Sequence, residues 1–157
     1  MNYKLIIGVV LLILSICIGI EFAKKYKKKR VFFTEFYSFN DILLSEISFG
    51  MSTIPQIIKT NYLEISDFYS RLQSKYIDKN NDFLKIAYLN DKENEFFKFY
   101  IDNIGKSGSI SSLEYVKSVK SKIESYQKDA VKLEEKNKPL CIKLSIIIGL
   151  IALIALL

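Results

Sequence analysis

The sequence predicts an all-α protein in which a small helical bundle lies between two transmembrane helices. Two apolar runs, residues 3–23 and 140–157, flank a central segment in which apolar residues recur at intervals of three and four. Such intervals are typical of amphipathic helices, and no strand-like alternation of any length interrupts them.

The two apolar runs have the lengths of membrane spans. Residues 3–23 would rise roughly 31 Å as a helix, against a bilayer core of about 30 Å, and residues 140–157 would rise roughly 27 Å. A cleaved signal peptide or a lipoprotein signal at Cys17 would be alternatives for the first run, and a buried core helix for the second. No small-residue cleavage site follows the first run, and Ile16 precedes Cys17 where a small residue is needed. We therefore expect two uncleaved spans.

A dense basic segment, residues 24–30, follows the first span and predicts its orientation. Its six cations are Lys24, Lys25, Lys27, Lys28, Lys29 and Arg30. Only Lys4 precedes the span, whereas three lysines (132, 136 and 138) precede the second span. Because cationic flanks stay on the cytoplasmic side, we expect residues 31–139 in the cytosol and both termini outside.

The same basic segment bears on the partners of the chain. The formal net charge of +6 equals the contribution of this segment, so the rest of the chain is nearly balanced. No basic face for a nucleic acid is therefore expected. The lysines can also touch anionic lipid head groups. The lipid bilayer is the partner that this composition predicts.

Within residues 31–139, helical periodicity predicts a bundle. Residues 31–49 have one broad apolar face and end at Gly50. A helix is then expected from Ile54 to about Tyr76, and another after a break at Asn90–Asp91. The last soluble helix is expected to start near Ser112, behind a Ser111–Glu114 capping box, and to end at a Pro139 hinge. Its apolar seam has coiled-coil spacing: Val116, Val119, Ile123, Tyr126, Ala130 and Leu133.

The composition argues against catalysis and metal binding. The chain has no histidine, and both of its cysteines lie inside or beside the apolar runs, which excludes a His-based triad and a zinc site. Gly105-Lys106-Ser107 imitates a phosphate-binding loop, but Tyr100 stands where that motif needs glycine. The acids Glu93, Glu95 and Asp102 are expected on an exposed helix side. We therefore predict no enzyme, no cofactor and no small-molecule substrate.

Two stretches of the chain resemble the stage III sporulation protein AB family of endospore-forming bacteria. In residues 43–58, LLSEISFGMSTIPQII, the positions Leu43, Glu46, Ile47, Phe49 and Gly50 match the family's segment of the form leucine-x-x-glutamate-isoleucine-x-tyrosine-glycine. In residues 104–116, IGKSGSISSLEYV, Ile104, Gly105 and Ser107 match a leucine-glycine-x-serine-aspartate loop, with Gly108 in place of the aspartate and Ser112 in place of a glutamine.

The resemblance implies a part in sporulation. The family's cytosolic domain is similar to the platform proteins of type II secretion and type IV pilus machines, which sit in the inner membrane and engage a cytosolic ATPase. By this analogy the protein would help to build the channel between mother cell and forespore, docking the sporulation ATPase beside other membrane subunits of the channel. The residues expected to contact the partner are Glu46, Phe49 and Gly50.

A second hypothesis comes from the late helical seam. A membrane-tethered coiled-coil scaffold outside sporulation would self-associate through residues 112–137. The first hypothesis requires these residues to pack inside a monomeric bundle, whereas the second requires them to face another copy.

Overall fold

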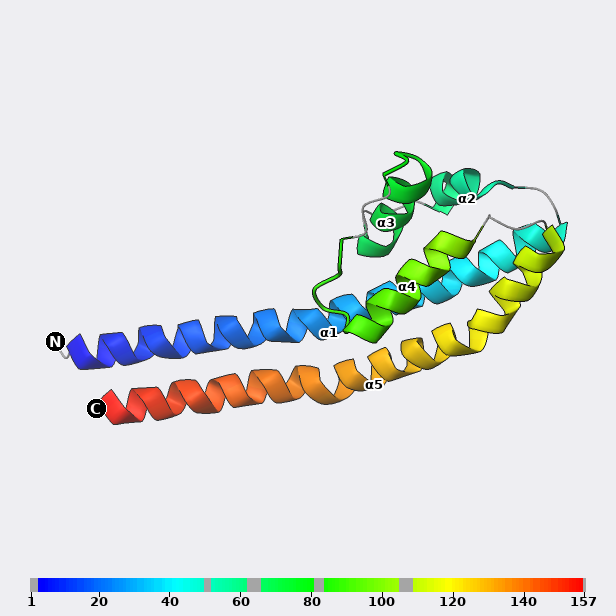
Figure 1. Cartoon of the computed structure of the whole chain (residues 1–157). Coiled ribbons are helices and arrows are strands. Elements are labelled where there is room, and N and C mark those ends of the chain that lie inside the picture. Colours follow the sequence, from blue (N-terminus) through cyan, green and yellow to red (C-terminus); the bar gives the residue numbers. More distant parts are fainter. Residues whose placement is uncertain (1–2, 50–51, 62–65, 81–83, 105–108, 157) are drawn as a thin grey trace. The chain divides into compact units, whose positions relative to one another are not determined.

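The computed structural model describes residues 3–49, 52–61, 66–80, 84–104 and 109–156. These residues form five helices and no strand: α1 (Tyr3–Phe49), α2 (Ile54–Asn61), α3 (Asp67–Tyr76), α4 (Asp91–Asn103) and α5 (Ser109–Leu156). The predicted all-α class is confirmed over this part of the chain (Figure 1). The chain divides into two compact units: unit 1 is Met1–Arg30 with Asp129–Leu157, and unit 2 is Val31–Lys128.

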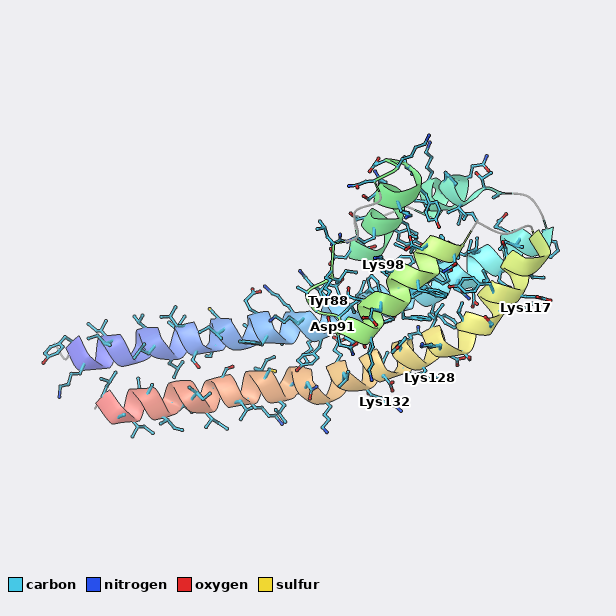
Figure 2. All side chains as sticks on the ribbon, in the orientation of Figure 1. Tyr88, Asp91, Lys98, Lys117, Lys128 and Lys132 are labelled. Atoms are coloured by element: carbon cyan, nitrogen blue, oxygen red, sulfur yellow. The ribbon has the colours of Figure 1, made fainter. Side chains whose placement is uncertain are left out.

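Unit 1 is an antiparallel pair of helical segments, the first part of α1 and the last part of α5, which lie side by side (Figure 1). Both α1 and α5 are long and apolar enough to cross a membrane. Large apolar side chains, such as Ile13, Ile18 and Ile151, project outward from this pair and are exposed. The side chains in Figure 2 surround both helices of the pair along their length. An outer surface of this composition is suited to lipid.

Small residues bring the two helices of unit 1 close together. A Cβ on Gly149 would lie 3.1 Å from Leu12 Cα, and one on Gly8 would lie 2.8 Å from Leu153 Cδ1. A Cβ on Gly19 would lie 3.2 Å from the Cys141 carbonyl oxygen and would overlap the Ser145 hydroxyl. Close approach at small residues is how helices gain packing energy in lipid, where apolar burial alone provides no drive.

Serine side chains add hydrogen bonds at the same interface. The Ser15 hydroxyl donates to the Ser145 carbonyl oxygen at 2.6 Å, which joins the two helices. The Ser145 hydroxyl donates to the Cys141 carbonyl oxygen at 2.7 Å, within α5. Both hydroxyls thus have a hydrogen-bond acceptor, and an unpaired hydroxyl would be costly if this interface lay in lipid.

Unit 2 has an aromatic core. Phe36 of α1 is fully buried and its ring lies 4.6 Å from Tyr100, 5.4 Å from Phe97 and 5.5 Å from Phe68, measured between centroids. The apolar face predicted on residues 31–49 is confirmed. Ile47 on this face is half-buried. Four of its side chains are almost completely buried: Phe32, Phe36, Phe39 and Leu43. Edge-to-face aromatic contacts add to the burial of apolar area that stabilises this unit.

The prediction of one helix from Ile54 to Tyr76 is wrong. Helix α2 ends at Asn61, and α3 begins at Asp67 behind Ser66, whose backbone is extended with φ −95° and ψ 155°. The Ser66 side chain accepts a hydrogen bond from the Tyr69 amide at 3.2 Å, so it is the N-cap of α3. Before α2, the Thr53 amide donates to Gln56 Oε1 at 2.8 Å, which is the reciprocal half of a capping box.

The break predicted at Asn90–Asp91 is confirmed, but the exposure predicted for Glu93 is wrong. Asn90 caps α4, its side chain accepting from the Glu93 amide at 2.8 Å, and Glu93 accepts from the Asn90 amide at 2.9 Å. Glu93 is only 5% exposed because it closes this capping box. The neighbouring Asn94 side chain donates to the Ile86 and Leu89 carbonyl oxygens and so ties the preceding loop to α4.

Both long helices continue where the sequence predicts a change. Helix α1 runs through the basic segment 24–30 without a break, because lysine and arginine are good helix formers. Helix α5 starts at Ser109 rather than Ser112 and passes through Pro139, where a hinge was predicted. Pro139 is exposed, so solvent can satisfy the carbonyl group that the proline leaves without an amide donor. The Ser111 side chain of the predicted capping box lies outside the described residues.

The close packing of unit 1 predicts that Gly19 tolerates no large side chain. The substitution Gly19→Leu should lower the stability of the chain in detergent by about 1–3 kcal/mol, because the added side chain would be forced into α5. Thermal unfolding measured by circular dichroism reports the change. Ile18→Phe, an enlargement at the exposed neighbouring position, is the control and should melt with the wild type. Equal melting of Gly19→Leu and wild type would contradict this packing.

Candidate functional site

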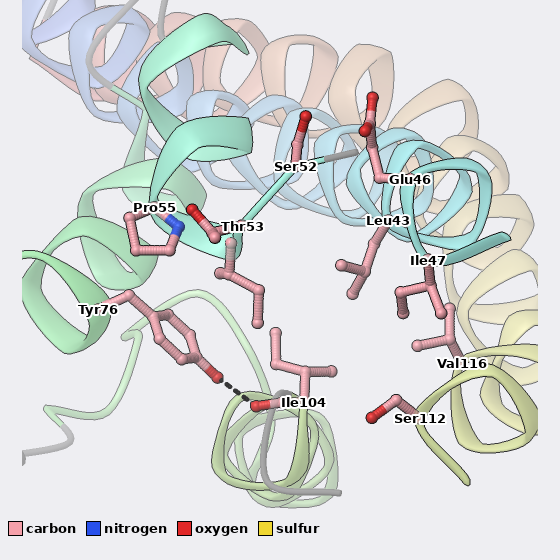
Figure 3. A pocket seen from close by; sticks show the side chains of 11 residues that line it. Leu43, Glu46, Ile47, Ser52, Thr53, Pro55, Tyr76, Ile104, Ser112 and Val116 are labelled. Carbon is pink, nitrogen blue, oxygen red and sulfur yellow. Dashed lines mark hydrogen bonds between the residues drawn. The ribbon is translucent and has the colours of Figure 1, made fainter. Parts of the chain in front are cut away.

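A pocket of about 440 Å³ opens in unit 2 at the end of α1 (Figure 3). Its lining comes from α1, the start of α2, α3, the end of α4 and α5: Leu43, Glu46, Ile47, Ser52, Thr53, Ile54, Pro55, Tyr76, Ile104, Ser112 and Val116. Most of these side chains are apolar, and Glu46 carries the one charge among them. The volume lies in the range of small binding pockets, about 300–1,000 Å³.

Helical spacing places the α1 side of this pocket. Leu43, Glu46 and Ile47 are separated by three and four positions, so they share one face of α1. Leu43 and Ile47 turn toward the centre of the pocket, whereas the Glu46 carboxylate points away from it at the rim (Figure 3). The Thr53–Gln56 cap holds the chain in a turn that brings Ile54 and Pro55 to the opposite wall.

Tyr76 contributes a hydroxyl group to one wall of the pocket, and this hydroxyl already has hydrogen-bond partners within the protein. Its hydroxyl donates toward the carbonyl oxygens of Ile101 and Ile104, at 2.5 and 3.0 Å. Burial, assisted by the nearby Asp102 charge, raises the pKa of the Tyr76 phenol, so it stays protonated as a donor. An ion pair at 2.8 Å between Lys75 and Asp102 also joins α3 to α4 beside this wall. The Tyr76 hydroxyl and the Lys75–Asp102 ion pair therefore serve to hold α3 against α4.

Of the three predicted contact residues, the structure describes two. Glu46 is half-buried on the rim and makes no hydrogen bond or ion pair with another described residue. Phe49, one turn further along α1, is 74% exposed, which is unusual for a ring of that size. Gly50 lies outside the described residues. The pocket rim thus presents the Glu46 carboxylate, and the exposed Phe49 ring lies on the next turn of α1, outside the pocket lining.

The lining of this pocket has the composition of a binding site for an apolar group. The polar side chains of the lining are one carboxylate and four hydroxyl groups: Glu46, Ser52, Thr53, Tyr76 and Ser112. Among the described residues, no group of three or more potential ligands could hold a metal ion. An apolar side chain would fill the pocket, and a cation beside it would meet Glu46.

The predicted orientation residues all lie on α1 in unit 1. Lys24, Lys25, Lys27 and Lys28 are exposed, and Lys29 and Arg30 are half-buried. Arg30 forms an ion pair with Glu134 of α5, which also receives a hydrogen bond from Lys138 at 3.3 Å. Sequence reasoning missed this pair, because nothing local signals that Arg30 and Glu134 meet.

Comparison of the chain with family models, with curated proteins and with solved structures finds no match. The sporulation family therefore stays a prediction from the residues quoted above.

The Arg30–Glu134 pair predicts a pH-dependent stability. Burial alone would raise the pKa of the Glu134 carboxyl, but the hydrogen bonds from Arg30 and Lys138 lower it overall. A folded-state pKa below the ordinary value near 4.5 means that the carboxylate stabilises the fold above that pH, and that this contribution is lost as the pH falls further. Glu134→Gln should therefore lower the melting temperature at pH 7, with the difference closing in acid.

Melting temperatures of both proteins across this pH range test the effect. Glu135→Gln, a change at the exposed neighbouring acid, should melt with the wild type throughout. If the melting temperature of Glu134→Gln stayed below that of the wild type by the same amount down to pH 3, the charge of the Glu134 carboxylate would not contribute to stability.

Proposed function

We propose that this protein is a non-enzymatic, two-span membrane platform that holds a helical domain on the cytosolic side and docks a soluble partner there. The observation that carries the proposal is the antiparallel pairing of two long apolar helices in unit 1, with its exposed apolar outer surface. An exposed surface of this kind is costly in water and favourable in a bilayer.

The charge distribution supports the orientation. Six cations follow the first span within residues 24–30, and lysines 132, 136 and 138 precede the second. Under the positive-inside rule both sets favour a cytosolic location for residues 31–139, with both termini outside. Antiparallel pairing in unit 1 is consistent with the two termini sharing one side of the membrane.

The Glu46 pocket is the proposed docking place. An interface gains most from an anchor side chain that fills a desolvated pocket, with charges at its rim that select the partner. The apolar lining and the rim carboxylate fit a partner segment that carries a large apolar residue next to a lysine or arginine. Exposed Phe49 would extend the contact outside the pocket.

The sequence resemblance supplies the identity of the proposed partner. If the chain acts as the stage III sporulation protein AB family does, the partner is the cytosolic ATPase of a sporulation channel. The membrane would then be the mother-cell membrane facing the forespore, and other membrane subunits of the channel would lie beside the protein. Three residues of the segment that resembles the family line the pocket: Leu43, Glu46 and Ile47.

The self-associating scaffold is less well supported. It requires residues 112–137 to offer an apolar seam to a second copy. Val116 and Ile123 of that seam are fully buried within unit 2, and Val119 and Tyr126 are half-buried. A seam that is engaged in its own bundle leaves little apolar area for another copy.

Charge reversal at the rim tests the docking proposal. Glu46→Lys should reduce recovery of the ATPase with the full-length protein from cross-linked sporulating cells by at least about tenfold, because it opposes the partner's cation and adds a repulsive contact. The recovered ATPase is quantified by mass spectrometry.

The matched control for this experiment is Glu95→Lys, the same reversal at an exposed acid of α4 away from the pocket. It should recover the ATPase as the wild type does. Full recovery and normal sporulation with Glu46→Lys would rule out the pocket as the docking place.

A further inference from the structure

Three contacts fix the register of the helix pair in unit 1. Gly8 meets Leu153, Gly19 meets Ser145, and Arg30 pairs with Glu134. Because the helices are antiparallel, residues 20–29 of α1 lie opposite residues 135–144 of α5, between the second and third contacts. The sequence alone gives no such alignment, since each helix could be shifted along the other.

This register gathers lysines from both helices into one band. Between the two contacts α1 contributes five lysines and α5 contributes three: Lys24, Lys25, Lys27, Lys28, Lys29, Lys136, Lys138 and Lys143. The same intervals contain only two acids, Glu21 and Glu135. We call these eight lysines the lysine collar.

At least three of the collar's eight lysines have no acid paired with them among the described residues. Lys24 pairs with Glu21, and Lys138 shares Glu134 with Arg30. Lys27, Lys28 and Lys136 are exposed and make no ion pair with another described residue. A band of cations without matching acids attracts an anion of high charge density, of which phosphate is the commonest biological form.

The surroundings of the collar distinguish lipid phosphate from free phosphate. Phe22 is 53% exposed, and the Lys25 ammonium lies 4.9 Å from the centroid of its ring. Leu140 and Leu144, in the facing interval of α5, are also exposed. A free phosphate ion gains nothing from these apolar groups, whereas a phospholipid meets them with its acyl chains and meets the lysines with its head group.

We propose that the lysine collar binds the head-group phosphates of anionic phospholipids, using lysines of both helices at once. The inference rests on the proposed membrane placement but not on the docking of a partner. It also goes beyond orientation, since the positive-inside rule is satisfied by the cations of α1 alone. Each exposed lysine at such a boundary favours anionic lipid by about fivefold.

The test compares three forms of the full chain in detergent containing equal amounts of phosphatidylglycerol and phosphatidylcholine. They are the wild type, the collar variant K27Q/K28Q/K136Q and the control K92Q/K98Q/K117Q. The collar variant keeps four cations of residues 24–30 to set orientation. The control removes three exposed lysines of unit 2, two of which are labelled in Figure 2. Native mass spectrometry measures the ratio of the two lipids retained.

Wild type and control should retain phosphatidylglycerol in preference to phosphatidylcholine, and the ratio of the two retained lipids should fall by at least about fivefold in the collar variant. Equal retention of both lipids by the wild type, or an equal loss in the control, would overturn the proposal. So would displacement of phosphatidylglycerol by millimolar sodium phosphate, which would identify a site for a free anion. Alkaline carbonate extraction of membranes separates these outcomes from failure of the membrane placement, because a chain that does not span would be released.

Discussion

The close contact between the apolar parts of α1 and α5 is the constraint on which the rest of the structure depends. Glycine at positions 8, 19 and 149 allows the backbones to approach, and the Ser15–Ser145 hydrogen bond satisfies a polar group between them. The ion pair of Arg30 with Glu134 continues the pairing to the boundary of unit 1. The same contact surface aligns the lysines of the two helices of unit 1.

Unit 2 is stabilised by the packing of aromatic side chains. This packing does not extend to the end of α1, where the pocket lies. The centre of unit 2 is a dense aromatic core around Phe36, in which fully buried rings from α1, α3 and α4 meet. At the end of α1 this packing gives way to the pocket, which has the Glu46 carboxylate at its rim, and the exposed ring of Phe49 follows one turn further along α1. Rigid helices thus present a small apolar cavity, an arrangement that suits recognition of a partner segment.

The sequence is informative where structure is local and uninformative where distant residues meet. Periodicity predicts the buried face of residues 31–49, and the family resemblance draws attention to Glu46. Periodicity does not reveal the N-cap at Ser66, because the apolar spacing continues across the break between α2 and α3. Tyr76 and Ile104 enter the pocket from other helices, so no short pattern reveals them. The need for glycine at position 19 becomes visible only in the structure, where Ser145 lies opposite it.

The account is tested most directly by the side of the membrane on which the helical unit lies. In a chain with Cys17→Ser and Cys141→Ser, a single cysteine introduced as Lys98→Cys, at an exposed position of α4, reports on unit 2. A second chain with Tyr3→Cys reports on the amino-terminal end of α1. In intact spheroplasts a membrane-impermeant maleimide should label the Tyr3→Cys chain and leave the Lys98→Cys chain unlabelled until the membrane is opened. Labelling of Lys98→Cys in intact spheroplasts would contradict the account.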